Sequence, residues 1–116
     1  SRTDYKMNPR RIDFQRLREE RQLVAGEKYI VDGRNLSFGR DNTLDIFEEI
    51  ADALNILDLL KLRMAGKANR EPLRMIDSLR TNLESAAWSC YQLREHLPLE
   101  YFEESTERIG LDNDRQ

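Results

Sequence analysis

Apolar residues recur in alternating steps of three and four in the second half of this chain. The series is Ile76, Leu79, Leu83, Ala86, Cys90, Leu93 and Leu97. This spacing places the side chains on one stripe of an α-helix, as in the seam of a coiled coil. Pro72 suits the first turn of such a helix. The pattern predicts one long helix, from about residue 72 to about residue 97, packed nearly antiparallel to a neighbouring helix.

Capping signals predict two further helices before this one. Asn8-Pro9 supplies an N-cap residue followed by proline at the first helical position, and Gly26 marks an end. A second helix, from about residue 43 to about residue 65, ends at Gly66 in the same way. Between these two helices lie residues 27–42, which contain two glycines and no sustained period. We expect an ordered loop there, with a short extended piece at residues 29–31.

Composition fits a small helical protein. At 116 residues, with 39% hydrophobic and 35% charged residues, the chain suits one domain with a charged surface. Another helical turn is expected around Tyr101 and Phe102. The predicted fold class is therefore all-α: a bundle of three main helices plus a short C-terminal helical element. We expect a single domain over residues 1–110 and a polar, disordered tail over 111–116.

Charge and cysteine content exclude some classes of function. A net charge of −3 argues against general nucleic-acid binding, which needs a basic excess. No stretch approaches the roughly 18 apolar residues of a membrane span, and no apolar segment suggests a secretory signal. The single cysteine, Cys90, excludes an intrachain disulfide and fits a reducing compartment. We expect a cytoplasmic protein.

The segment TLDIFEEIADALNILDLL carries carboxylates within an apolar helix. Its polar side chains share one helical face and are followed on that face by Ile56 and Leu59; they are Asp45, Glu48, Glu49, Asp52 and Asn55. A solvated face would stay polar, so we expect protein to surround this helix. Clustered carboxylates in such a place must pair with basic side chains or bind a cation. Mg²⁺ or Mn²⁺ suits oxygen ligands at this spacing.

A second source of carboxylates should face this helix if it binds a metal. Glu20 lies at the edge of the apolar stripe of the first helix, near Leu17 and Val24. It is a candidate ligand. The alternative is a flanking residue that pairs with Arg16 or Arg21.

The run EEIADALNIL, residues 48–57, resembles the second half of the EExxE…ExxD signature of the all-α, MazG-like nucleoside triphosphate pyrophosphohydrolases. The resemblance implies a Mg²⁺-dependent enzyme, of nucleotide-pool or phage type, that splits a nucleoside triphosphate to its monophosphate and pyrophosphate. Glu49 and Asp52 match the ExxD ligand pair, and Asn55 falls where the following turn lines the nucleotide pocket. The upstream half is present only as Glu19-Glu20, with Leu23 where a further glutamate would stand.

This resemblance assigns roles to the carboxylates. Glu20, Glu49 and Asp52 would hold the metal, with Glu48 as a further ligand or a water-orienting base. Basic side chains of the loop, Lys28, Arg34 and Arg40, are candidates for binding the substrate's phosphates or base. The alternative is a plain connector whose arginines neutralise the acidic helix.

Four other side chains carry weaker signals. His96, the only histidine, suits the favourable placement of positive charge near a helix C-terminus. Cys90 is expected to be a small core residue. Trp88 and Tyr91 lie off the seam and, if exposed, would form a dimer surface.

Two functions follow from these observations. The leading hypothesis is metal-dependent hydrolysis of a nucleoside triphosphate by a homo-oligomer, a dimer or higher. The rival is a non-enzymatic helical interaction or regulatory module of phage or mobile-element type, whose acidic helix pairs with arginines of its own loop or of a partner.

Overall fold

The computed structural model describes residues 8–31, 34–35, 39–67 and 69–103, and side chains within 8–26, 39–67 and 69–103. The chain divides into two compact units, Ser1–Gly39 with Ser105–Gln116, and Arg40–Glu104. Each unit is described by itself below. The predicted single domain over residues 1–110 therefore stays a prediction.

The first unit contains α1, Phe14–Tyr29. The prediction that this helix begins at Pro9 is wrong, because Asn8 forms a separate turn: its side-chain oxygen accepts from the Arg10 amide at 3.1 Å. Asp13 caps the true start, since its carboxylate accepts from the Arg16 amide at 3.0 Å. The expected end at Gly26 is also wrong, because glycine is tolerated inside a helix at a cost of about 1 kcal/mol.

A small β-hairpin, with two residues in each strand, follows α1. Strand β1, Ile30–Val31, pairs antiparallel with β2, Arg34–Asn35, in the register Ile30↔Asn35 and Val31↔Arg34. The extended piece expected at residues 29–31 falls at β1. Residues 32–33 and 36–38 lie outside the described residues, so the ordered loop between the first two helices stays a prediction.

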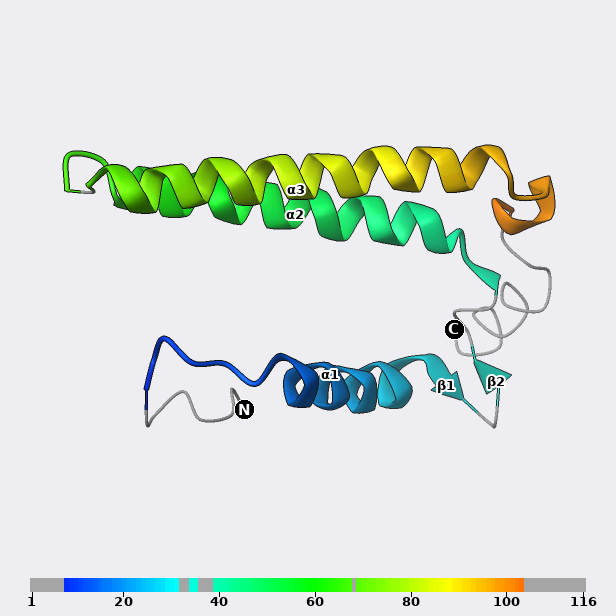
Figure 1. Ribbon diagram of the computed structural model, residues 1–116. Helices are drawn as coiled ribbons and strands as arrows, with labels where there is room; N and C mark the ends of the chain where they lie inside the picture. The colour runs from blue at the N-terminus through cyan, green and yellow to red at the C-terminus, as the bar shows by residue number, and fades with distance from the viewer. Residues whose placement is uncertain (1–7, 32–33, 36–38, 68, 104–116) are drawn as a thin grey trace. The chain divides into compact units, whose positions relative to one another are not determined.

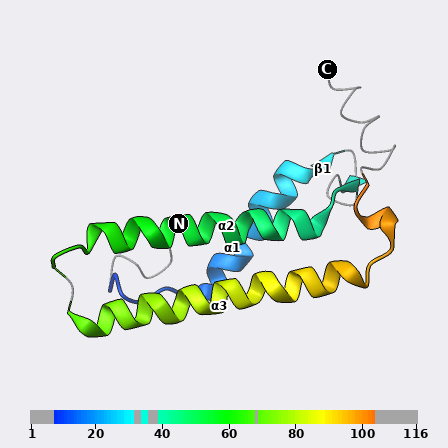
Figure 2. The ribbon, with the colours of Figure 1, turned by 90° about the horizontal axis from the view of Figure 1, so that it is seen from above.

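The second unit is a helical hairpin. Helix α2 spans Asn42–Arg63 and helix α3 spans Arg70–Glu95, and they lie side by side in opposite directions (Figures 1 and 2). The turn between them includes Gly66, whose φ of +74° suits glycine. A short 3₁₀ helix, η2, covers Leu99–Tyr101 and confirms the turn expected there. The all-α fold class is thereby confirmed.

The seam between α2 and α3 contains the core. Its most buried side chains are Leu57, Ile76 and Cys90, each 4–5% exposed, together with Thr43. Cys90 donates from Sγ to the Thr43 carbonyl oxygen at 3.6 Å, so its interpretation as a small core residue is confirmed. On α2 the buried and half-buried seam positions are Thr43, Phe47, Ile50, Leu54 and Leu57.

The seam of α3 differs from the predicted one at three positions. Its buried and half-buried residues are Ile76, Arg80, Leu83, Ala87, Cys90 and Arg94, and Leu97 continues the series just after the helix ends. The predicted members Leu79, Ala86 and Leu93 are exposed instead. The physical reason is that both arginines lie over the seam and pair with carboxylates near α2, Arg80 with Asp58 and Arg94 with Asp41. A prediction from hydrophobicity alone places in the seam the leucines that directly precede these arginines.

None of the helices in the described ranges has a stretch long and apolar enough to cross a bilayer.

Candidate functional site

The predicted carboxylates of α2 lie on its surface. Glu48, Glu49 and Asp52 are all exposed, and none forms a hydrogen bond or ion pair with another residue that the structure describes. The apolar residues beside them are also open: Ile46 is 45% and Ile56 65% exposed. Within the second unit this stripe of α2 is therefore exposed, and the expectation that protein surrounds α2 stays a prediction.

One of the predicted polar side chains on this face of α2, Asp45, forms an ion pair. Asp45 receives two bonds from Arg40, Nε to Oδ2 at 2.9 Å and Nη2 to Oδ1 at 2.7 Å. This fork-shaped pair matches the alternative in which a loop arginine neutralises the acidic helix. The other two candidates that were expected in the loop lie elsewhere, Lys28 in the last turn of α1 and Arg34 in β2, and their side chains are outside the described side chains.

The predicted metal ligands come from both units. Glu49 and Asp52 lie three residues apart on α2, while Glu20 is a half-buried residue of α1 in the first unit. Within the described residues, no group of three or more His, Cys, Asp or Glu side chains is arranged to hold a metal ion. Two helical carboxylates with water suit Mg²⁺ as part of a site. The complete ligand set stays a prediction.

The most connected polar group of the described side chains is a cluster that sequence analysis missed. Asp41 caps α2 by accepting from the Leu44 amide at 3.0 Å. Arg94, near the end of α3, donates Nη1 to both Asp41 oxygens at 2.9 Å and to Thr43 Oγ1 at 2.6 Å. The Arg94 guanidinium carbon also lies 4.4 Å from the centre of the Phe102 ring. This cluster fastens the start of α2 to the end of α3.

Electrostatics within the cluster lower the pKa of Asp41 below its usual value of 3.8. Desolvation is the largest single influence and raises the pKa, but hydrogen bonds from Arg94, the Leu44 amide and Thr43, with the charge of Arg94, together outweigh it. Asp41 precedes a helix in the sequence, which is an N-cap signal. Its partner Arg94 is distant in sequence and comes next to Asp41 only because α2 and α3 pack antiparallel.

An apolar face lies open along one side of the hairpin. We call it the open face and define it by six side chains that are 43–65% exposed: Ile46, Ile56 and Leu60 of α2, and Met75, Leu79 and Leu93 of α3. Five of the six directly precede a buried or half-buried seam residue, and Leu60 lies one turn after Ile56. Positions that directly precede seam residues fall on the same side of two antiparallel helices, which explains why both helices contribute. A shallow depression of about 310 Å³ in this region is lined by Asp45, Ile46, Glu49, Ile50, Ala53 and Leu83.

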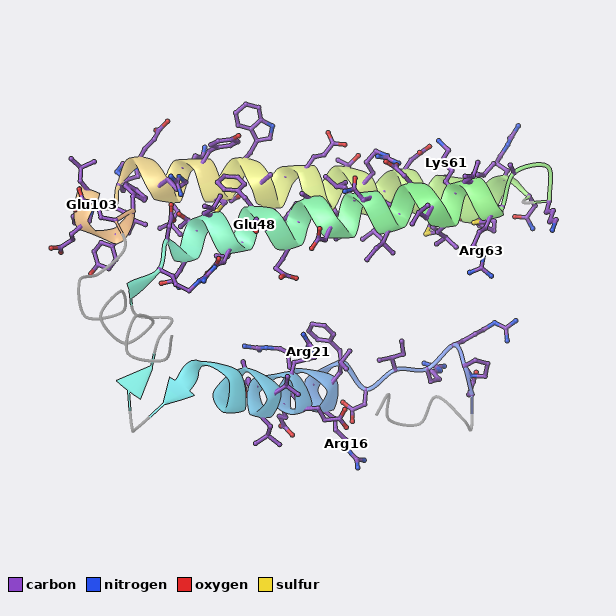
Figure 3. All side chains as sticks on the ribbon, turned by 180° about the vertical axis from the view of Figure 1, so that it is seen from behind. Arg16, Arg21, Glu48, Lys61, Arg63 and Glu103 are labelled. Carbon is purple, nitrogen blue, oxygen red and sulfur yellow. The ribbon has the colours of Figure 1, made fainter. Side chains whose placement is uncertain are left out.

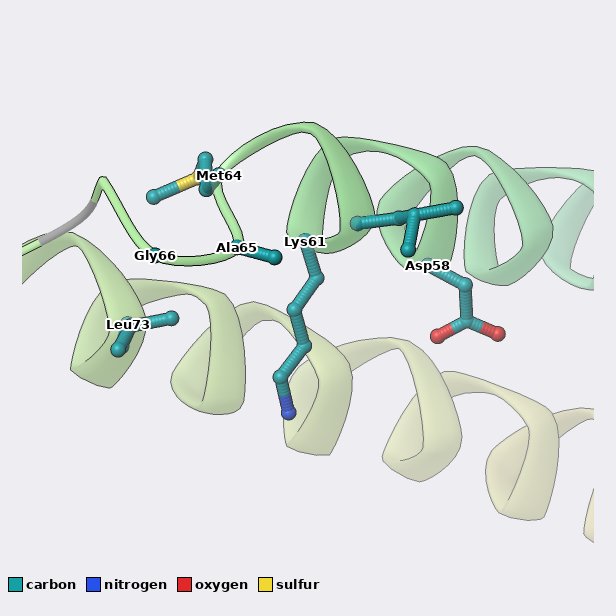
Figure 4. Close-up of a pocket in the computed structure, with 7 residues that line it drawn as sticks. Asp58, Lys61, Met64, Ala65, Gly66 and Leu73 are labelled. Atoms are coloured by element: carbon teal, nitrogen blue, oxygen red, sulfur yellow. The ribbon is translucent and has the colours of Figure 1, made fainter.

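A second depression, of about 380 Å³, lies where α2 turns into α3 (Figure 4). Its lining includes Lys61, whose side chain extends from α2 towards α3, and also Asp58 and Gly66. None of the predicted site residues lines it.

Of the remaining candidates, Trp88 and Tyr91 are exposed as the sequence analysis required for a dimer surface, and that surface stays a prediction. Trp88 and Tyr91 are 69% and 55% exposed, with ring centres 5.9 Å apart. Tyr91 also contacts Phe47 of α2, with ring centres 4.6 Å apart. His96 is the C-cap residue of α3, the position at which its placement near a helix C-terminus was expected.

Comparisons with known proteins define no class for this chain. No protein-family model, no curated protein and no solved structure matches it at a significant level.

Proposed function

We propose that the chain is a helical protein-interaction module in which the open face of the α2–α3 hairpin binds a partner. The observation that carries this proposal is the open face itself, to which each helix contributes three large, half-exposed apolar side chains. An apolar face of this kind on a small protein marks an interaction surface.

The gain from covering the open face is substantial. Full burial of a large aliphatic side chain contributes roughly 1.5–3 kcal/mol. Covering the exposed half of one such side chain therefore contributes roughly 1 kcal/mol, and six of them roughly 6 kcal/mol. Association itself costs about 4–15 kcal/mol. The apolar contacts thus need support from complementary charge, which Glu48, Glu49 and Asp52 of α2, without ion pairs among the described residues, can supply.

A photo-crosslinking amino acid tests this proposal in the cells that produce the protein. It is placed at Leu60, on the open face, and in a matched control at Ser78, an exposed position of α3 off that face. We expect an intermolecular adduct from position 60 and none from position 78. Equal labelling from both positions, or an adduct only to residues 14–25 of the same chain, would refute the proposal.

The second candidate is a Mg²⁺-dependent nucleoside triphosphate pyrophosphohydrolase. Glu49 and Asp52 favour it, because they are exposed at ExxD spacing and have no ion-pair partner in the described part of the chain. In this proposal Glu20 completes the metal ligands and Glu48 orients water. Mg²⁺ would supply charge stabilisation for the phosphates and a more acidic bound water.

The substrate contacts of this candidate are Asn55, which is exposed one turn after Asp52, together with Lys28 and Arg34. Arg40 would have to leave Asp45 to reach a phosphate. The buried thiol of Cys90 fits the cytoplasm, where nucleotide pools lie.

A panel of canonical and modified nucleoside triphosphates with Mg²⁺ or Mn²⁺ tests the second candidate. At least one should give monophosphate and pyrophosphate, and Asp52→Asn should abolish that turnover without changing the unfolding free energy, because Asp52 is exposed and unpaired among the described residues. Inactivity of the wild-type protein across the panel would eliminate the enzyme.

A further inference from the structure

We infer that the occupant of the open face is a second copy of this chain, joined through an antiparallel α2–α2 contact in which Glu49 of each copy pairs with Arg63 of the other. This inference rests on the proposed function as an interaction module and names its partner. It depends on two properties of α2: a second apolar seam and a separation of charge along the helix.

The second seam has the spacing of a helix–helix contact. Its members alternate in steps of three and four, beside the seam that faces α3, and are Ile46, Glu49, Ala53, Ile56, Leu60 and Arg63. Ile56 is 65% exposed and Leu60 43% exposed, so this stripe of α2 is not filled by α3. The stripe is apolar in the middle and has a charge of opposite sign towards each end.

Charge is separated along α2. Between Asn42 and Ile56 the helix carries four carboxylates and no basic residue, whereas Lys61 and Arg63 lie near its end and Lys67 follows it. Figure 3 shows Glu48 in the first part of α2, and Lys61 and Arg63 near the other end. Two of the acidic side chains are paired within the hairpin, Asp45 with Arg40 and Asp58 with Arg80.

The remaining charges of this helix, and Lys67 just after it, have no ion-pair partner among the residues that the structure describes. In the described residues Glu48, Glu49 and Asp52 form no ion pair, and neither do Lys61, Arg63 and Lys67. The helix dipole favours acidic residues only in the first turn, which accounts for Asp45 but not for Glu49 or Asp52, one and two turns further on. When the α2 of a second copy runs in the opposite direction, the acidic first part of each α2 lies beside the basic end of the other.

Numbering fixes the register. Glu49 and Arg63 are each seven residues from Ile56, or about 10 Å along the helix axis. An antiparallel pair centred on Ile56 therefore places Glu49 opposite Arg63 twice, with the two Ile56 side chains in contact at the centre. A parallel pair would instead place Glu49 against Glu49. The charge pattern thus selects the antiparallel arrangement, which is the two-fold contact of a symmetric dimer.

Charge reversal tests this register in the full chain. Sedimentation equilibrium over a range of concentrations measures the dimer dissociation constant of the wild-type protein, Glu49→Arg, Arg63→Glu and a control, Glu95→Arg, on α3. Each α2 variant should raise the homodimer Kd by about tenfold or more, because it places like charges opposite each other twice. An equimolar mixture of the two α2 variants should form a heterodimer of nearly wild-type affinity, since both pairs are then complementary.

The sedimentation results decide between a dimer in this register and other states of the chain. A wild-type chain that is monomeric up to about 100 µM, a range chosen to detect even weak association, overturns the inference. The proposed function survives that result if Leu60 crosslinks to a different protein, and fails if it crosslinks to none. A dimer that the reversals do not weaken, or that the mixture does not restore, also overturns the inferred register. Circular dichroism at 222 nm should show that the variants retain their helices, because Glu49, Arg63 and Glu95 are exposed.

Discussion

Asp41→Ala should destabilise the hairpin by about 2 kcal/mol. Loss of the N-cap acceptor for the Leu44 amide costs about 1 kcal/mol. Loss of the carboxylate leaves Arg94 without its two 2.9 Å bonds. Because the Arg94 side chain is 30% exposed, water replaces part of that interaction, and the cost is about 1 kcal/mol rather than that of a fully buried charge.

Asp41→Asn separates the cap from the charge. Its side-chain oxygen can still accept from the Leu44 amide, so the expected loss is only about 1 kcal/mol. Arg94→Met keeps an unbranched stem near Phe102 and should cost a similar amount. The double variant should then lose less than the sum of the single losses, since both remove the same ion pair.

The assay is urea unfolding followed by circular dichroism at 222 nm, at one fixed protein concentration because assembly adds to apparent stability. The pKa of Asp41 is lowered in the folded chain, so its charge stabilises the fold above the unfolded pKa of about 3.8 and is lost as pH falls through the folded value. The difference between wild type and Asp41→Asn should therefore shrink below about pH 4. Additive single losses, or a difference that stays constant from pH 7 to pH 2.5, would refute the cluster as a charged tether.

Three further results are expected. Leu57→Ala should cost about 2–4 kcal/mol in urea unfolding, because this 4% exposed side chain lies in the seam, and a loss below about 1 kcal/mol would show a loose core. Gly66→Ala should destabilise the fold by about 1 kcal/mol and so lower the Tm, since the φ of Gly66 is +74°. Gly26→Ala, inside α1, should instead raise the helix content. A gain in stability from Gly66→Ala, or a loss of helix content from Gly26→Ala, would contradict these backbone conformations. Millimolar Mg²⁺ should raise the Tm if Glu49 holds metal, and leave the Tm and the dimer unchanged if Glu49 pairs with Arg63, as calorimetry and sedimentation can measure.

The sequence by itself determined the helices of this protein. Periodicity and capping residues located α2 and α3 to within a few residues, because a helix depends on local hydrogen bonds and on side chains near in sequence. The start of α1 was placed too early, since Asn8 and Asp13 are both good capping residues and only the folded backbone selects Asp13. Fold class was therefore accessible from pattern, and the two boundaries of α1 were not.

Only the tertiary structure decided which side of each helix faces the core. The predicted seam of α3 took Leu79 and Leu93 where the fold places Arg80 and Arg94, because a guanidinium can lie over a seam once a carboxylate from the other helix meets it. That partner is distant in sequence, so no local pattern reveals it. The shift by one residue turns the leucines outward and creates the open face. Within the hairpin Glu49 and Asp52 lie on the surface, and the enclosure of α2 by further protein stays a prediction.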